Sequence, residues 1–102
     1  MDGELWDTVR AGKAWLDRHS GLGEHEITVR ILKVMEEAGE AAAARIGMLG
    51  QNPRKGVSHT AEDVAAELAD VAITALVAIE SLGFDAQEVM KACARKVSDR
   101  IE

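Results

Sequence analysis

Apolar residues recur at intervals of three and four positions along most of the 102-residue chain, which is the period of an α-helix. The clearest case is the segment from Glu24 to Met48. Its apolar positions in this period, with one just beyond its end, are Ile27, Ile31, Val34, Ala38, Ala42, Ile46 and Leu49. The alternation of apolar and polar residues that is typical of strands is absent. The pattern therefore predicts an all-α protein.

Turn residues interrupt this pattern three times and divide it into four helices. The interruptions are the stretches HSGLGEH and GQNPRKGVSH and the glycine at position 83. Thr60 followed by Asp63 is a capping-box pattern with aspartate in the place of glutamate. The predicted helices run from about Glu4 to Arg18, from Glu24 to Met48, from the N-cap Thr60 to Leu82, and from the N-cap Asp85 to the end. Short links between them favour an antiparallel four-helix bundle-like domain.

The composition fits one domain over residues 1–102 and indicates a core that is small for its helices. Hydrophobic residues make up 47% of the chain, but aromatic residues only 3%, and there is no tyrosine. Much of the apolar content is alanine, which suits closely packed helices. With so few large side chains, we expect a second subunit to complete some helix faces.

The charge and the apolar runs exclude several classes of partner. A net charge of −6 disfavours nucleic-acid polymers and anionic membranes, which recruit basic patches, but it allows a phosphorylated small molecule held through divalent cations. Cys93 is the single cysteine, so no intramolecular disulfide forms. The N-terminus lacks a secretory pattern, and the longest nearly apolar run, Val71 to Ile79, is too short to span a bilayer. We expect a soluble, cytoplasmic protein.

Two pairs of carboxylates are the candidate chemistry. Glu37 and Glu40 lie at i, i+3 on the second predicted helix, and Glu67 and Asp70 repeat that spacing on the third. The 26 residues between the pairs are enough to finish one helix, turn and return alongside it. Carboxylates that converge stay ionised only if a positive charge joins them, and oxygen ligands suit Mg²⁺ or Mn²⁺.

A solvated acidic face is the alternative interpretation of the same residues. On the second helix, Glu40 points away from the apolar arc, which favours solvent. On the third helix, the sequence beyond Asp70 is apolar on all sides and is therefore expected to be buried. Glu67 and Asp70 would then lie at the mouth of a buried region, where unpaired charge is expensive. From the spacing alone, both interpretations stay open.

The paired motif resembles a known family. EEAGE (Glu36 to Glu40) followed by ELAD (Glu67 to Asp70) is similar to the EExxE…ExxD signature of the all-α nucleoside triphosphate pyrophosphohydrolases, the MazG-like group. The resemblance covers the second and third helices. It implies the all-α NTP pyrophosphatase type of fold, a homodimer or homotetramer, and Mg²⁺ held by Glu37, Glu40, Glu67 and Asp70.

The implied reaction splits an NTP or dNTP between the α and β phosphates, giving the monophosphate and pyrophosphate. Glu36, beside the ligand pair, would orient or deprotonate the attacking water, although a solvent-facing charge is the alternative. Members of this family often carry a Lys…Asn…Arg pattern on the last helix. Lys96 and Arg100 would bind phosphate here, or serve as ordinary C-terminal cations, because Ser98 and Asp99 stand where the asparagine is expected.

Other substrate contacts are less specific in the sequence. Lys33 is a candidate ligand for substrate, but its spacing favours an ion pair with Glu37. Trp15 could stack on a nucleobase, although a tryptophan on an amphipathic helix more often belongs to a core or an interface. His19 or Asn52 could read the edge of the base. The loop cations Arg54 and Lys55 would close over a triphosphate or form a solvated turn.

Two rival classes of function remain. A di-iron bundle protein needs Glu-x-x-His pairs, and none of the histidines at positions 19, 25 and 59 occupies a matching position. A non-enzymatic helical oligomerisation or regulatory module that keeps the fold is the second alternative. The intact acidic positions argue against this alternative but do not exclude it.

Overall fold

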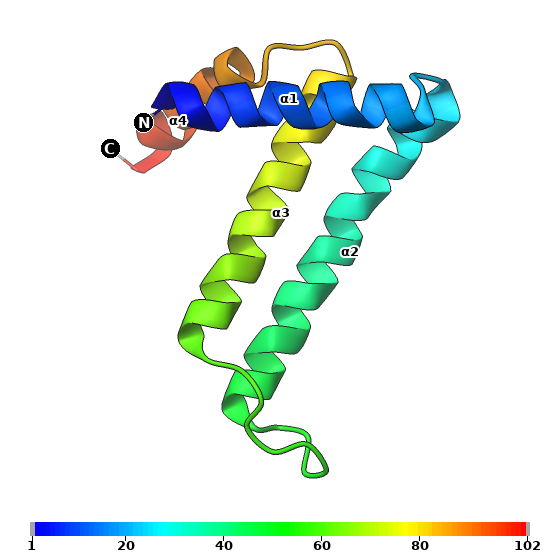
Figure 1. Ribbon diagram of the computed structural model, residues 1–102. Helices are drawn as coiled ribbons and strands as arrows, with labels where there is room; N and C mark the ends of the chain where they lie inside the picture. Colours follow the sequence, from blue (N-terminus) through cyan, green and yellow to red (C-terminus); the bar gives the residue numbers. More distant parts are fainter. Residues whose placement is uncertain (1, 102) are drawn as a thin grey trace. The chain divides into compact units, whose positions relative to one another are not determined.

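The computed structural model describes residues 2–101, and the side chains of residues 3–101. The described chain forms four α-helices and no strand, so the all-α prediction is confirmed. The helices are α1 (Asp2–Ser20), α2 (Glu24–Leu49), α3 (Ala61–Ser81) and α4 (Ala86–Ile101) (Figure 1). Within the described residues, no helix combines the length and the apolar character needed to cross a bilayer.

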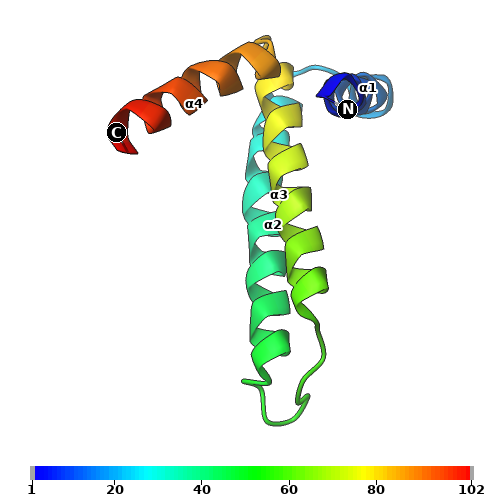
Figure 2. The same ribbon diagram turned by 90° about the vertical axis from the view of Figure 1, so that its left-hand side faces the viewer.

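The helices divide between two compact units. One unit contains α1, the first turn of α2, the end of α3 and α4. The other unit, Thr28–Ala75, is a hairpin formed by the rest of α2 and α3 and the loop that joins them. In the hairpin the two helices run antiparallel, side by side (Figures 1 and 2), as the short link predicts.

The helix ends follow the local signals in the sequence. The capping box at α3 is confirmed, because the Thr60 N–H donates to Asp63 Oδ2 (2.9 Å) and the Asp63 N–H donates to Thr60 Oγ1 (3.1 Å). Asp85 caps α4 by accepting the N–H groups of Gln87 and Glu88 through Oδ1. Gly83 ends α3 with φ of 94°, a conformation that favours glycine.

α1 extends beyond the expected range at both ends. The sequence predicts a helix from about Glu4 to Arg18, whereas the structure has Asp2–Ser20. At the C-terminal end, the Gly21 N–H still donates to the Asp17 carbonyl (3.0 Å), so helical bonding continues until the glycine. For α4, the expectation that the helix reaches the end of the chain cannot be followed past Ile101, because residue 102 lies outside the described residues.

Small residues make the core of each unit. In the hairpin, Ala41 and Ala44 of α2 are buried together with the side chain of Arg30. In the other unit, Val9 is fully buried, and a Cβ at Gly12 would lie 3.5 Å from Val77 Cγ2. Among the described residues of that unit, the others that are buried are Leu76, Val77, Ala78, Ser81 and Ala86. Alanine on the inner face of α2 permits close approach of α3, and this approach positions the acidic side chains described next.

Candidate metal centre

Three carboxylates from the two helices of the hairpin converge on one point. Glu37 comes from α2, and Glu67 and Asp70 come from α3. One carboxylate oxygen of each lies within 4.8 Å of the other two. Glu37 and Glu67 are partly buried, and Asp70 is exposed. The hairpin thus brings together three of the four carboxylates singled out in the sequence, at its side rather than at its loop.

Glu40, the fourth carboxylate, lies outside this group of three and is exposed. It remains near enough to influence Glu37. The pKa of Glu37 is raised, first by burial and then by the negative charges of Glu40 and Asp70. The crowding of charge expected from the sequence is therefore present in the fold, and it makes a proton or a cation favourable at this point.

Glu67 is the carboxylate of the cluster whose surroundings most favour a cation. Its Oε2 atom is buried and has no hydrogen-bond partner among the described residues. A buried acceptor without a partner is unfavourable by about 1–3 kcal/mol, and more when it is charged. Buried polar groups in native proteins are nearly always satisfied. The position of this oxygen, beside two other carboxylates, fits a site that is completed by a cation.

Lys33 and Glu36 lie next to the cluster but pair with each other. Lys33 Nζ donates to Glu36 Oε1 over 2.9 Å, and both side chains are exposed. The pairing of Lys33 with Glu37 that the spacing favoured is therefore wrong. Glu36 at i+3 is equally within reach, whereas Glu37 contributes its carboxylate to the cluster with α3. The hydrogen bond with Glu36 and its charge raise the pKa of Lys33.

The predicted substrate residues outside the hairpin are exposed. Lys96 and Arg100 lie on α4, and neither forms an ion pair with a described residue. Trp15 on α1 stacks on His19, with ring centroids 4.1 Å apart, and His19 Nδ1 lies 2.8 Å from the Trp15 carbonyl oxygen. One face of the indole is therefore covered by its own helix, while half of the side chain (52%) stays exposed.

A cavity of about 260 Å³ lies at the loop end of the hairpin. Asn52 lines it, as do Lys55, Ser58 and His59 of the loop and Gly47 of α2. Sequence reasoning named Asn52 and Lys55 but missed Ser58, His59 and Gly47 as members of a site. Gly47 in the last turn of α2 was the available signal, because a glycine inside a helix often marks a close approach of another segment.

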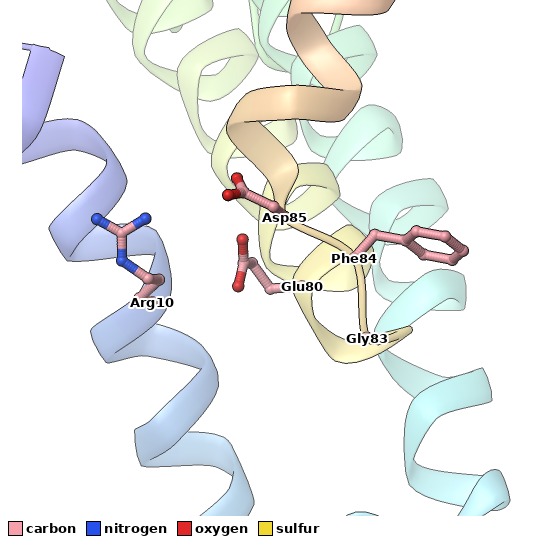
Figure 3. Close-up of a pocket in the computed structure, with 5 residues that line it drawn as sticks. All are labelled: Arg10, Glu80, Gly83, Phe84 and Asp85. Carbon is pink, nitrogen blue, oxygen red and sulfur yellow. The ribbon is translucent and has the colours of Figure 1, made fainter.

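A second hollow, in the unit that contains α1 and α4, is accounted for by local structure. It measures about 320 Å³ and is lined by Arg10, Glu80, Gly83, Phe84 and Asp85. In Figure 3 the Arg10 guanidinium lies opposite the two carboxylates, and Phe84 points away from them. Glu80 accepts the N–H of residue 86 (2.7 Å), Asp85 caps α4, and Arg10 pairs with an aspartate at position 7 (2.8 Å). Each of these three charged groups therefore already has a local partner.

Comparison of the chain with family models, with curated proteins and with solved structures yields no match.

Proposed function

We propose that the protein is a Mg²⁺-dependent nucleotide pyrophosphohydrolase that cleaves an NTP or dNTP between the α and β phosphates. One observation carries the proposal: carboxylates 30 or more positions apart in the sequence, Glu37 on one side and Glu67 and Asp70 on the other, meet within 4.8 Å. The motif pair EEAGE and ELAD, which resembles that of the MazG-like enzymes, supplies the reaction type.

The donor set fits a hard divalent cation. All three ligand atoms are carboxylate oxygens, which Mg²⁺ and Mn²⁺ prefer over nitrogen or sulfur. Around octahedral Mg²⁺, adjacent ligand oxygens are about 2.9 Å apart and opposite ones about 4.2 Å apart. Three oxygens that lie within 4.8 Å of one another can reach these spacings when the side chains rotate towards the ion by about 1–2 Å. The partnerless Oε2 of Glu67 gains a partner in the same step.

Glu37, Glu67 and Asp70 would hold the cation, and Glu40 at the edge of the cluster offers a further carboxylate. When bound, the cation would neutralise phosphate charge and lower the pKa of a coordinated water. Glu36 is our proposed acceptor for the proton of the attacking water. Its exposed ion pair with Lys33 has to open for this role. Opening it requires little free energy, because exposed ion pairs stabilise a protein by only about 0–1 kcal/mol.

The remaining substrate contacts are proposed from the sequence. Lys96 and Arg100 are proposed to bind phosphate, and Trp15 is proposed to stack on the base with the indole face that His19 leaves free.

Self-association completes the proposal. Large apolar side chains on the hairpin are strongly exposed, with Leu32 at 60%, Met35 at 74% and Leu68 at 56%. A second copy of the chain, in a homodimer or homotetramer, would remove these side chains from water. The same observation also favours the second candidate function, a helical association module without enzymatic activity. The activity assay separates the two.

The test is a panel of NTPs and dNTPs with Mg²⁺, scored for pyrophosphate against orthophosphate. We expect pyrophosphate release that is lost in Glu37→Gln and Asp70→Asn, while both variants keep the helical circular dichroism of the wild type. Glu62→Gln is the matched control, because Glu62 is exposed on α3 and lies outside the cluster. Orthophosphate as the main product would refute the cleavage position. Absence of turnover and of Mg²⁺ or Mn²⁺ binding in calorimetry would favour the association module.

A further inference from the structure

The cavity at the loop end of the hairpin presents hydrogen-bond donors and no carboxylate. The polar side chains that line it belong to Asn52, Lys55, Ser58 and His59. Lys55 forms no ion pair with any described residue, although the chain carries a net charge of −6. The cavity is therefore cationic and has no carboxylate in its lining, which makes it complementary to an anion.

Hydrogen bonds within the loop direct the remaining donors. Asn52 Oδ1 accepts the Arg54 N–H (3.1 Å), so the amide N–H₂ is the part of Asn52 left for a ligand. Ser58 Oγ and His59 Nδ1 share one hydrogen bond of 2.9 Å. If the hydroxyl donates, a neutral imidazole carries its proton on Nε2. If the ring donates, the hydroxyl proton is free. Either way, this pair keeps one donor for a ligand.

Gly47 allows this pair to lie against α2. A Cβ at position 47 would lie 2.5 Å from Ser58 Oγ and closer still to His59 Nδ1, well inside van der Waals contact. The Ser58 N–H donates to the Gly47 carbonyl (3.0 Å), and the N–H of Gly56 donates to the Asn52 carbonyl (2.9 Å). The loop is thus held by its own backbone bonds, and its donors are preorganised.

We propose that this cavity is a phosphate-binding subsite in which Lys55, Asn52 and the Ser58–His59 pair bind a phosphate group. Its volume of about 260 Å³ lies just below the range of about 300–1,000 Å³ for whole small ligands, so a group or fragment fits better than an entire nucleotide. In this proposal Asn52 binds a phosphate group, whereas the sequence analysis assigned it to the edge of the base.

The place of the subsite on α2 suggests which phosphates it takes. The lining of the cavity begins on α2 at Ala43, which follows Glu37 of the carboxylate cluster by six residues, or about 9 Å along the helix axis. A polyphosphate that begins at the carboxylate cluster can therefore extend towards the cavity. In terms of the proposed function, on which this role rests, the subsite binds the terminal phosphates of the substrate and the departing pyrophosphate. The affinity for phosphate itself does not depend on that function.

The test measures pyrophosphate binding to the full chain by calorimetry in EDTA, so that no divalent cation contributes. We expect Lys55→Gln to weaken binding at least tenfold. Arg45→Gln is the matched control, because Arg45 is an exposed cation of α2 that does not line the cavity, and this change should alter the affinity less than twofold. Pyrophosphate should also shift the ring ¹⁵N resonances of His59, and not those of the histidines at 19 and 25.

A second variant tests the shape of the cavity without removing a charge. Gly47→Ala displaces Ser58 and His59 and should also weaken pyrophosphate binding at least tenfold, with the helical circular dichroism retained. Absence of pyrophosphate binding by the wild type, or equal affinity in Lys55→Gln, overturns the subsite. Binding that depends on Lys55 in a protein that hydrolyses no nucleotide keeps the subsite and removes the proposed reaction. If Lys55→Gln hydrolyses nucleotide with an unchanged KM and the wild type does not bind pyrophosphate, the proposed reaction stands and the subsite is refuted.

Discussion

The substitution Glu67→Gln should stabilise the protein when no cation is present and remove most of its response to Mg²⁺. In the wild type, Glu67 Oε2 is buried without a partner and lies beside the carboxylates of Glu37 and Asp70. Glutamine has nearly the same shape, carries no charge, and can donate its amide N–H₂ to either neighbouring carboxylate. The change therefore converts a repulsive contact into a hydrogen-bonded one.

The size of the effect follows from the unpaired oxygen. A buried acceptor without a partner is unfavourable by about 1–3 kcal/mol, and part of this is recovered in glutamine, so we expect a gain of about 1–2 kcal/mol in EDTA. For a domain of this length, each kcal/mol shifts Tm by about 4–8 °C. Mg²⁺ at ten times its Kd should stabilise the wild type by about 1.4 kcal/mol, and Glu67→Gln by much less.

The assay is thermal unfolding followed by circular dichroism, in EDTA and across a Mg²⁺ titration. The expected signature is a difference in Tm that depends on Mg²⁺: Glu67→Gln melts above the wild type in EDTA, and the gap closes as Mg²⁺ rises. Glu62→Gln, an exposed change on the same helix, should follow the wild type in both conditions. A variant that melts below the wild type in EDTA, together with a wild type that ignores Mg²⁺, would refute the metal-site reasoning.

Two further predictions concern the capping box and the glycine beside the cluster. The backbone N–H of Thr60 and then its side chain lower the pKa of Asp63, so the folded-state pKa lies below the unfolded value. The stability from this carboxylate is therefore complete above about pH 3.9 and is lost as pH falls through the lower, folded pKa. In urea unfolding, the free energy of unfolding of Asp63→Asn should fall less steeply with decreasing pH than that of the wild type. Equal slopes for the two proteins would contradict this. A Cβ added at Gly39 would meet no atom of the described residues within 4 Å, apart from its chain neighbours and the nearby backbone of its own helix. Gly39→Leu should leave the thermal stability of the monomer intact but reduce oligomer mass in light scattering or pyrophosphate release, and no change in either would exclude a role in assembly or catalysis.

The helices and their ends could be predicted from the sequence because their causes are local. The three-and-four spacing from Ile27 onwards, the Thr60 and Asp63 pair, and the glycine at position 83 each act within one or two turns of the chain. The same locality explains the small error at α1, where helical hydrogen bonding continues to Gly21. Nothing in these rules depends on which other segment lies nearby.

The identity of the partners was decided only by tertiary structure. The i, i+3 spacing made both Glu37 and Glu40 candidate ligands, but the packing of α2 against α3 brings Glu37 to Glu67 and leaves Glu40 outside the group of three. In the same way, the side-chain conformation of Lys33 directs its ion pair to Glu36.

The loop cavity depends still more on tertiary structure. His59 reaches Gly47 only after the hairpin has closed, across a loop whose conformation is set by its own backbone hydrogen bonds. Spacing along one helix is fixed by its period, whereas the register between two helices depends on the whole packed interface. The sequence alone therefore determined where the carboxylates lie on each helix, and the tertiary structure determined which of them meet.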